Sequence, residues 1–288
     1  MEENLKKPEW LKTPLPAGKV FFDIKKDLRD RKLVTVCEEA KCPNIGSCWN
    51  TGTATFMVLG DTCTRACRFC HIKTGNPGGW TDPNEPLQVA QSTKKMGLKY
   101  VVLTMVDRDD IEDGGASHVS EVVSSVREWN PNIKVELLTG DYQGDPTSLQ
   151  TLLRNPPDVF AHNIETIERL SPRVRDARAK YKTSLEVLKR AKDINPQQWT
   201  KSSIMLGLGE TPAEVEKAMD DLRDHGVTIL TLGQYMRPTK KHLSVKEWVH
   251  PNIFKELEVI AYKKGFQAVA SGPLVRSSHH AGELFDKL

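Results

Sequence analysis

The sequence predicts an α/β protein, a partial (βα)6 TIM-like parallel barrel with an N-terminal and a C-terminal extension. Two observations lead to this fold class. From residue 51 onward, short β-rich runs alternate with longer helical patterns, which is typical of parallel βα units. A polar cluster also follows each expected strand, and parallel barrels collect their chemistry at the carboxyl ends of the strands.

The chain divides into three expected regions. Residues 1–50 form an N-terminal extension, residues 51–265 the barrel, and residues 266–288 a C-terminal segment. Prolines break the extension early, so we expect only one helix there, over 21–31. The loop after that helix carries three cysteines.

Short apolar runs mark six strands of the barrel, and longer periodic stretches mark its helices. The expected strands span 54–59, 100–105, 134–138, 159–163, 202–206 and 229–232. The expected helices span 87–96, 117–129, 147–154, 184–193, 212–225 and 251–264. Six units are too few for the usual eight-stranded closure, so we expect an incomplete barrel that opens sideways.

Residues at the helix ends support these bounds. Thr211 followed by Pro212 and Glu214 resembles a helix N-cap with proline in the first turn. Gly226 and Gly265 stand where glycine ends a helix in the left-handed conformation. The helix expected over 212–225 is therefore marked at both ends.

Composition excludes several classes of protein. No run approaches 18 consecutive apolar residues, so we expect no membrane-spanning helix and no membrane partner. The N-terminus lacks the apolar core of a signal peptide, and we expect a cytoplasmic protein, or one in an organelle matrix if a transit peptide has been removed. A net charge of +3 is too small to indicate nucleic acid binding.

One local basic cluster has two interpretations. It fits a solvated helix entrance, which is how most charge runs behave, or a docking patch for an acidic protein. Its members are Arg173, Arg175, Arg178, Lys180 and Lys182.

The most informative feature is the arrangement of the six cysteines in two triplets. The first is spaced C-x4-C-x5-C and comprises Cys37, Cys42 and Cys48. The second is spaced C-x3-C-x2-C and comprises Cys63, Cys67 and Cys70. A chain of this length without a secretion signal is not expected to use its cysteines for disulfides. Two sets of three soft thiolates indicate two metal sites.

Spacing favours iron–sulfur clusters over zinc. A structural zinc site has four ligands, usually in C-x2-C pairs, and only Cys67 and Cys70 show that spacing. His71 directly follows Cys70 and is poorly placed to complete a tetrahedron. Three thiolates with one further position fit a cubane cluster better. A zinc-stabilised binding module nevertheless stays open at this point, to be distinguished by iron and sulfide analysis.

The second triplet carries a family resemblance. With Phe69 before its last cysteine, and directly after the first barrel strand, it resembles the motif of the radical S-adenosylmethionine superfamily. The resemblance implies a [4Fe–4S] cluster whose open iron binds S-adenosylmethionine. It also implies the release of a 5′-deoxyadenosyl radical that abstracts hydrogen from an unactivated C–H bond.

The first triplet narrows this resemblance to one family. The segment CEEAKCPNIGSCW, placed upstream of the radical motif, is similar to lipoyl synthases. Further segments agree, and the resemblance extends from about residue 10 to residue 285. They are TATFMVLGDTCTRACRFC, VDRDDIEDGGASH, HNIETIERLSPRVRD, SSIMLGLGET, QYMRPT and SGPLVRSS.

This family implies a second, auxiliary [4Fe–4S] cluster, held by Cys37, Cys42 and Cys48. Its fourth protein ligand is a serine of a C-terminal RSS motif, which maps to Ser277. Without the resemblance, Ser277 would be interpreted as an exposed tail serine. An alkoxide on iron is unusual beside thiolates, which makes this ligand a plausible weak link when the cluster gives up sulfide.

The implied reaction inserts sulfur at C6 and C8 of an octanoyl chain that is amide-linked to a lysine of a carrier domain. The implied carriers are the glycine cleavage H protein and the E2 subunits of 2-oxoacid dehydrogenases. Other implied partners are an electron donor such as ferredoxin or flavodoxin and an iron–sulfur carrier that rebuilds the auxiliary cluster. Another radical enzyme with an auxiliary cluster is the rival interpretation.

Contacts to S-adenosylmethionine are expected at the strand ends. Asp107 and Arg108, after the second strand, stand where the superfamily contacts the methionyl group. Asn163 and Glu165, after the fourth, would bond the ribose or the amino-acid part, or else form a turn and a helix N-terminal carboxylate. Arg237 is expected either to face the pocket or to form a salt bridge at the barrel rim.

Two positions depart from the family pattern. His279 stands where the RSSY motif has tyrosine, and Ser47 stands where an acidic residue often precedes the last auxiliary cysteine. Neither change removes a cluster ligand. His279 raises the question of altered surroundings for the cluster or of an altered substrate preference.

Overall fold

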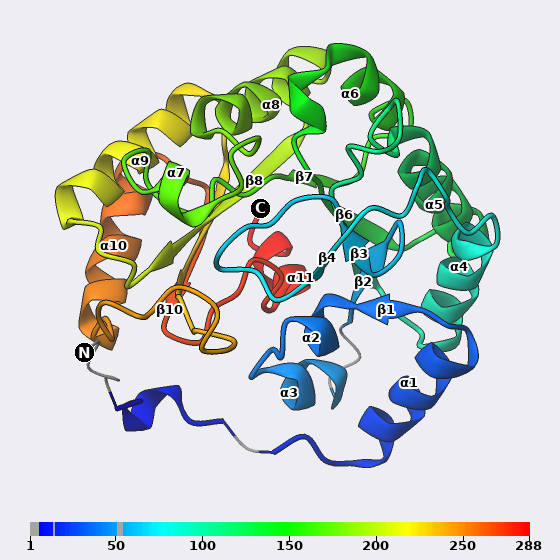
Figure 1. The fold of residues 1–288 in the computed structure, drawn as a ribbon, viewed down its shortest axis with the longest axis horizontal. Helices are drawn as coiled ribbons and strands as arrows, with labels where there is room; N and C mark the ends of the chain where they lie inside the picture. The colour runs from blue at the N-terminus through cyan, green and yellow to red at the C-terminus, as the bar shows by residue number, and fades with distance from the viewer. Residues whose placement is uncertain (1–5, 14, 51–53) are drawn as a thin grey trace.

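The computed structural model describes residues 6–13, 15–50 and 54–288, and its centre is an eight-stranded sheet curled into an incomplete barrel (Figure 1). Its strands, in spatial order, are β1 Val34–Thr35, β2 Thr55–Val58, β5 Tyr100–Met105, β6 Lys134–Leu138, β7 Val159–Ala161, β8 Trp199–Leu206, β9 Ile229–Gln234 and β10 Ala268–Gly272. Every neighbouring pair is parallel except β1 with β2, so the parallel barrel runs from β2 to β10.

The predicted α/β partial barrel is confirmed, with one more parallel strand than the six expected. β10 pairs in parallel with β9, in the register Ala268↔Ile229. The sequence analysis placed these residues in the C-terminal segment, outside the barrel, because alanine and glycine are weak strand formers. Pairing with β9 and the burial of Ala268 and Val269 outweigh that weak local preference.

Helices form an outer ring around the strands (Figure 1), where parallel βα crossovers place them. The ring helices are α4 Glu85–Lys95, α5 Ala116–Trp129, α6 Pro146–Leu152, α8 Tyr181–Ile194, α9 Pro212–Asp224 and α10 Pro251–Lys263, with the short α7 Ser171–Val174 before α8. The capping box of Thr211 and Glu214 starts α9 as expected, and Gly226 and Gly265 have positive φ angles of 78° and 91°. No helix in the described part of the chain is both long enough and apolar enough to cross a membrane.

The N-terminal extension spans the gap between the first and the last barrel helix. Helix α1 (Lys19–Asp30) buries Asp27, whose carboxylate accepts hydrogen bonds of 2.7 Å from Ser92 and Lys95 of α4. At the other end, Trp10 in the 3-10 helix η1 (Glu9–Leu11) packs edge-on against His250, the N-cap of α10. Figure 1 shows this segment in blue, passing from α10 to α4. Residues 1–5 of the expected extension and residues 51–53 at the expected start of the barrel lie outside the described residues.

The sequence predicted a loop for the first cysteine triplet, but the structure forms two short helices there. Cys37 belongs to the short helix α2 (Val36–Glu39) and Cys48 to α3 (Ile45–Asn50), with Cys42 between them. Thr35 caps α2 by accepting a hydrogen bond from the backbone N–H of Glu38 at 3.4 Å. Helices of one or two turns leave too little periodic pattern to be detected in a sequence.

The C-terminal tail (residues 273–288) turns back into the barrel and ends in helix α11 (Ala281–Phe285). Leu284 is buried against the first residues of three strands, Val159, Ile229 and Ala268. The ring of Phe285 lies 5.7 Å from that of Tyr100, the first residue of β5. Figure 1 shows α11, in red, in the middle of the ring of strands. Helix α11 therefore plugs the amino-terminal end of the barrel.

Candidate functional site

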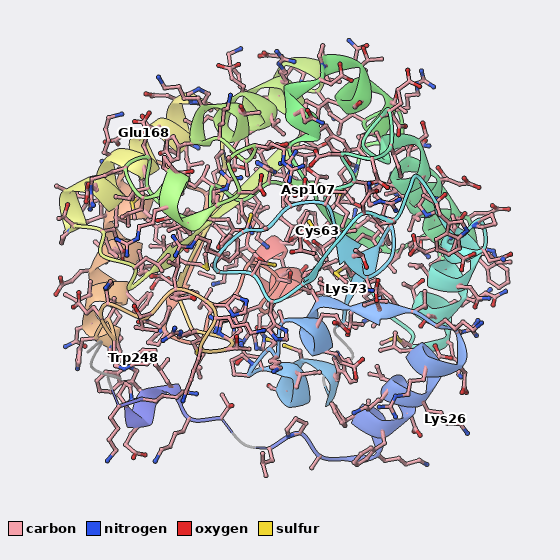
Figure 2. All side chains as sticks on the ribbon, viewed as in Figure 1. Lys26, Cys63, Lys73, Asp107, Glu168 and Trp248 are labelled. Atoms are coloured by element: carbon pink, nitrogen blue, oxygen red, sulfur yellow. The ribbon has the colours of Figure 1, made fainter. Side chains whose placement is uncertain are left out.

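A cavity of about 800 Å³ opens at the carboxyl ends of the strands, and all six cysteines line it. The strands contribute apolar walls through Met105 of β5, Leu138 of β6 and Met205 of β8. Figure 2 shows Cys63 and Asp107 near the middle of the molecule. The large pocket expected from polar clusters at the strand ends is therefore present, and it joins the two cysteine triplets.

Backbone hydrogen bonds tie the second triplet's loop (residues 63–70) to the rest of the barrel. Cys63 ends the small strand β3 (Thr62–Cys63), which pairs with β4 (Lys73–Thr74). The N–H of Thr64 donates to the carbonyl of Asp107 at 2.9 Å, and the N–H of Arg68 donates to the carbonyl of Val174 at 2.9 Å. The loop is held in place by elements that lie far from it in the sequence.

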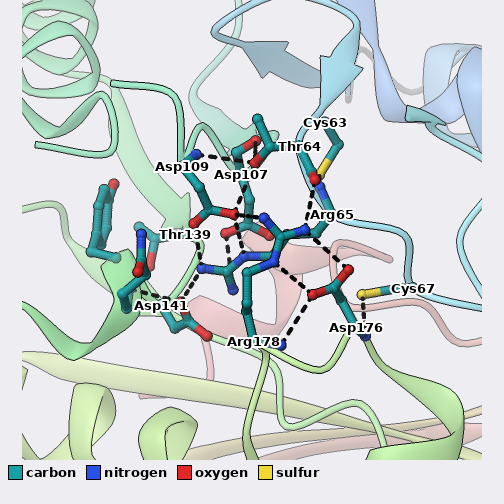
Figure 3. A network of polar contacts seen from close by, with 12 residues as sticks. Cys63, Thr64, Arg65, Cys67, Asp107, Asp109, Thr139, Asp141, Asp176 and Arg178 are labelled. Atoms are coloured by element: carbon teal, nitrogen blue, oxygen red, sulfur yellow. Dashed lines mark hydrogen bonds and ion pairs between the residues drawn. The ribbon is translucent and has the colours of Figure 1, made fainter. Parts of the chain in front are cut away.

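Arg65, in the middle of this loop, is buried among three aspartates (Figure 3). Its guanidinium nitrogens lie 2.7 Å from an oxygen of Asp141, 2.8 Å from one of Asp109 and 3.5 Å from one of Asp107. Burial alone would raise the pKa of Asp109 and Asp141, but the hydrogen bonds and charge of Arg65 outweigh it and hold both below their usual values. Arg65 thus fastens the loop to the ends of β5 and β6.

Asp107 behaves differently from its two neighbours. Burial, and then the charges of Asp141 and Asp109, raise its pKa to about 6 although Arg65 opposes this. Its side chain lines the cavity. One arginine therefore faces more negative charge than it can neutralise, and the excess lies at the cavity wall.

A second ion pair holds the other side of the loop. Asp176 accepts a hydrogen bond from the N–H of Ala66 at 2.9 Å and, through its own N–H, donates to Cys67 Sγ at 3.3 Å. Arg178 pairs with Asp176 at 2.9 Å and with Asp109 at 3.0 Å. Arg178 of the predicted basic cluster is thus paired with two carboxylates, although its side chain is exposed.

The buried thiols resist ionisation on their own. Burial, and then the neighbouring Cys42, raise the pKa of Cys37 to about 11 and that of Cys48 to about 12. Burial raises the pKa of Cys67 to about 11 and that of Cys70 to about 12. Because thiolates are the forms that bind metal, a positively charged group is needed to stabilise three sulfurs so close together.

The donor set fits an iron–sulfur cluster at each triplet. Each offers three soft sulfur ligands to one cavity, and sulfur ligands select such clusters. Backbone N–H groups already point at two of the sulfurs, with Arg65 N 3.4 Å from Cys63 Sγ and Asp176 N 3.3 Å from Cys67 Sγ. Across the described ranges, no three histidine, cysteine, aspartate or glutamate side chains form a group suited to a single metal ion.

The C-terminal tail lies beside the first triplet. Asn44, between Cys42 and Cys48, donates to the carbonyl of Leu274 at 2.7 Å, and Ser277 lines the cavity. The tail also packs directly on β9, since a Cβ at Gly233 would lie 2.2 Å from the carbonyl oxygen of Val275. The structure thus brings Ser277 to the same cavity as the triplet that the sequence assigned to it.

The fourth strand end supplies polar groups with unused hydrogen-bonding capacity. Asn163 donates to Glu165 at 3.1 Å, and its own side-chain oxygen is buried without a partner among the described residues. Burial raises the pKa of Glu165 although the charge of Arg175 opposes this. Glu165 also has a φ of 66°, which costs a residue with a Cβ about 1 kcal/mol. The unpaired amide oxygen of Asn163 and the strained backbone of Glu165 lie in one cavity wall. Together they indicate a ligand-binding surface.

Two other predicted contacts have different positions. Arg108 does not line the cavity: its guanidinium donates to the carbonyls of Leu59 and Trp80 at 3.1 and 2.8 Å and pairs with Asp110. It holds neighbouring loops together, so the geometry gives it no contact with a ligand in the cavity. Arg237 does line the cavity, but its guanidinium donates to the carbonyls of Thr239 and Lys240.

Sequence reasoning missed two charged groups of the cavity wall. Arg175 is buried, donates to Ser184 at 2.9 Å and faces Glu165 and Cys67, but in the sequence it stands among other basic residues. Asp141 has one oxygen on Arg65 and the other without a partner in the described part of the chain. The sequence did contain an indication for Asp141, because this residue closely follows the strand predicted over 134–138.

His162 supports this wall from behind. It is buried at the end of β7, with Nδ1 2.8 Å from the carbonyl of Thr139 and Nε2 2.8 Å from the hydroxyl of Ser184. Burial, and then the charge of Arg175, lower its pKa to about 4. Since Ser184 also accepts the hydrogen bond from Arg175, neutral His162 helps to fix Arg175 in place.

The buried His162 predicts a pH dependence of stability. In the unfolded chain a histidine takes up its proton near pH 6.5, before the folded protein does. The stabilisation is therefore complete above about pH 6.5 and is lost as the pH falls towards 4, by about 3 kcal/mol in total. Unfolding of the apoprotein in denaturant at a series of pH values measures it. A His162→Asn variant should lack this part of the slope, whereas the control His225→Asn should keep it; equal slopes in the two variants would contradict the prediction.

Comparison with known proteins places these features in a family. The family model of the radical SAM superfamily matches residues 57–222, and that of the N-terminal domain of lipoyl synthase matches residues 1–42. A protein named mitochondrial lipoyl synthase, from Drosophila mojavensis, is 55% identical over 98% of this chain and 79% of its own length. One named lipoyl synthase, from Thermus thermophilus, is 53% identical over 97% of this chain and 86% of its own.

Solved structures agree on the fold. Methylornithine synthase (PylB) is similar with a TM-score of 0.59, over 88% of this chain and 71% of that one, at 13% identity. The FeFe-hydrogenase maturase HydG from Carboxydothermus hydrogenoformans has a TM-score of 0.58 over 93% of this chain and 61% of that one, also at 13% identity. At such low identity these two comparisons concern the fold alone.

Proposed function

The chain belongs to the lipoyl synthase family of the radical SAM superfamily, and from this premise we propose which of its residues carry the reaction. The enzyme inserts two sulfur atoms, at C6 and C8, into an octanoyl chain bound to a lysine of a lipoyl-carrier protein. When bound, one [4Fe–4S] cluster with S-adenosylmethionine supplies the 5′-deoxyadenosyl radical, and the auxiliary [4Fe–4S] cluster supplies the sulfur.

The proposal assigns the two clusters to the two triplets. Cys63, Cys67 and Cys70 of the barrel hold the cluster that meets S-adenosylmethionine. The auxiliary cluster is held between the N-terminal extension (1–50) and the C-terminal segment (266–288), and its ligands are Cys37, Cys42, Cys48 and Ser277. Support comes from the shared cavity, where both triplets and Ser277 meet. The octanoyl chain would then lie along the apolar wall between the two sites.

Charged groups of the cavity wall match the polar ends of S-adenosylmethionine. The excess negative charge at Asp107, together with Asp141 and Glu165, would receive the ammonium group, and Arg175 the carboxylate. The unpaired oxygen of Asn163 would accept a hydroxyl or ammonium hydrogen bond. Arg108 drops out of this set because it lies outside the cavity, and Arg237 serves by shaping the loop that forms the rim.

The proposal includes the partners of the reaction and its location in the cell. The carrier would be the glycine cleavage H protein or an E2 subunit of a 2-oxoacid dehydrogenase. Electrons would come from a ferredoxin or flavodoxin, and an iron–sulfur carrier would rebuild the auxiliary cluster after each turnover. We place the reaction in the cytoplasm, with an organelle matrix as the second location because one relative is named mitochondrial.

The assignment is tested by anaerobic turnover of cluster-reconstituted protein with an octanoylated carrier domain, S-adenosylmethionine and a reductant. Mass spectrometry should show the carrier gaining two sulfur atoms. Formation of 5′-deoxyadenosine without sulfur on the carrier would contradict the substrate assignment. Protein purified anaerobically with two zinc ions and no iron would contradict both cluster sites.

Asn163→Ala is expected to weaken S-adenosylmethionine binding about tenfold, because a buried ligand group loses its hydrogen-bond partner. Calorimetric titration of S-adenosylmethionine into the loaded enzyme measures this directly. Asn155→Ala is the matched control, since Asn155 bonds Ser124 on the outside of the protein. If Asn163→Ala left the affinity unchanged, Asn163 would be a purely structural residue of the turn.

A further inference from the structure

Among the residues that the structure describes, the exposed charges that line the cavity are all positive. They belong to Lys7 of the N-terminal extension, Lys41 between α2 and α3, and Lys240 in the loop between β9 and α10. We call these three residues the lysine rim. The carboxylates of the cavity wall lie deeper and are buried or half-buried. The mouth of the cavity is thus positive although the chain as a whole is nearly balanced, with 41 basic and 38 acidic residues.

The rim lysines differ from the charges inside the cavity in their partners. Inside, Arg65 and Arg175 make hydrogen bonds or ion pairs to Asp141 and Ser184. At the rim, none of the three lysines forms an ion pair with a carboxylate of the described residues. Their charge is therefore available to a molecule that approaches the mouth of the cavity.

Lys41 is positioned at the cavity by the end of helix α2. Its φ is 51°, in the left-handed region that glycine or asparagine adopts at lower cost. It stands directly before Cys42 and lines the cavity. This conformation is an ordinary helix stop, in which the N–H of Cys42 donates to the carbonyl of Cys37 at 3.0 Å, and it fixes the backbone from which the exposed Lys41 side chain extends.

The chemistry of the substrate decides what approaches this mouth. The octanoyl chain is attached to a lysine of a folded carrier, so the chain reaches the inner sites only if the carrier surface around that lysine comes to the mouth. Side chains that flank the modified lysine are then brought within a Debye length, about 8 Å, of the lysine rim. Like charges there would be repelled and acidic side chains attracted.

We propose that the lysine rim docks acidic side chains that flank the octanoyl-lysine of the carrier. This inference rests on the proposed function and adds the chemical class of the carrier surface. The rim would speed encounter and orient the modified lysine over the cavity, and the apolar wall below would take the octanoyl chain.

Two labelled octanoyl-lysine peptides of equal length test this, one flanked by aspartate and glutamate and the other by asparagine and glutamine. Binding to the enzyme with both clusters is followed by fluorescence anisotropy without S-adenosylmethionine. At low salt the acidic peptide should bind about tenfold more tightly, and high salt should remove the difference. Lys240→Glu and Lys7→Glu should each weaken the acidic peptide up to about tenfold and leave the amide peptide nearly unchanged.

Lys26→Glu is the control, because it makes the same charge change on α1 at the periphery of the molecule (Figure 2). Equal affinities of the two peptides at low salt, or an equal loss in Lys26→Glu, would overturn the proposal. The proposal would also be overturned if the Lys240→Glu enzyme bound the acidic peptide normally but were reduced more slowly by an acidic electron-transfer protein. Lys240 would then serve the electron donor and not the carrier.

Turnover of the same peptides separates this proposal from the reaction itself. Sulfur insertion into both peptides with equal affinity would refute the lysine rim and leave the function intact. Tight, salt-sensitive binding of the acidic peptide without any sulfur insertion would refute the function and leave the rim standing.

Discussion

Replacing Ser277 with alanine is expected to abolish sulfur insertion and to leave cleavage of S-adenosylmethionine in place. The reason lies in the placement of the tail. Asn44 donates to the carbonyl of Leu274, and Arg276 donates to the carbonyl of Gln234 at 3.1 Å, so the tail is anchored directly before Ser277. In the proposed assignment, the auxiliary cluster of the variant would keep only three protein ligands, whereas the site at Cys63, Cys67 and Cys70 would be unchanged.

Three measurements check the Ser277→Ala protein: iron content, the Mössbauer spectrum of the auxiliary cluster, and 5′-deoxyadenosine formed per sulfur inserted. Uncoupled 5′-deoxyadenosine with no sulfur on the carrier is the expected pattern. Ser278→Ala is the closest control, because Ser278 is the next residue and also lines the cavity. Full activity in Ser277→Ala, with the loss found in Ser278→Ala instead, would move the ligand by one residue.

The barrel could be predicted from the sequence because its signals are local. The strand over 100–105 and the helix over 117–129 show in the pattern of apolar residues within one window, and the capping box at Thr211 needs only four residues. Strand β10 could not be recognised in this way. Its small residues gain their strand conformation from pairing with β9, a partner that a local window does not contain.

The site was predictable only where a motif carried it. The cysteine spacings and the RSS motif predicted which side chains would meet, and the structure brings all of them to one cavity. Arg175 and the partners of Arg65 carry no such motif. Their roles come from contacts between elements far apart in the sequence, such as Arg65 with Asp141. Arg108 shows what a position after a strand leaves open, because it follows the same strand as Asp107 but its guanidinium donates to the carbonyls of Leu59 and Trp80.

Arg65→Met is expected to destabilise the protein by about 3–5 kcal/mol and to prevent stable binding of the cluster at the second triplet. Methionine fills much of the space of arginine but leaves Asp107, Asp109 and Asp141 without their shared counter-ion. The loop also loses its attachment to the ends of β5 and β6 (Figure 3). Denaturant unfolding of the apoprotein measures the first effect, and iron content with the spectrum of the reduced cluster measures the second.

The dependence of this loss on pH separates charge from packing. In the wild-type protein the pKa values of Asp109 and Asp141 are lowered, so the stability they contribute is present above about pH 4 and is lost as the pH falls further. In Arg65→Met the buried Asp141 should have a raised pKa, whereas Asp109 keeps Arg178 at 3.0 Å, and protonation of Asp141 should stabilise the variant as the pH falls. The deficit of the variant is therefore expected to be largest near neutral pH and to narrow towards pH 4.

Two further variants test whether the charge of Arg65 or its packing anchors the loop. Arg65→Lys keeps one positive charge but cannot reach three carboxylates with a planar fork, so it should recover part of the stability at neutral pH. Arg68→Met removes an arginine from the same loop, but this side chain is exposed, and within the described ranges its only hydrogen bond goes to the carbonyl of Arg173 at 3.5 Å. A deficit that stays constant with pH, or an equal deficit in Arg68→Met, would mean that Arg65 acts by packing and that its charge does not anchor the loop.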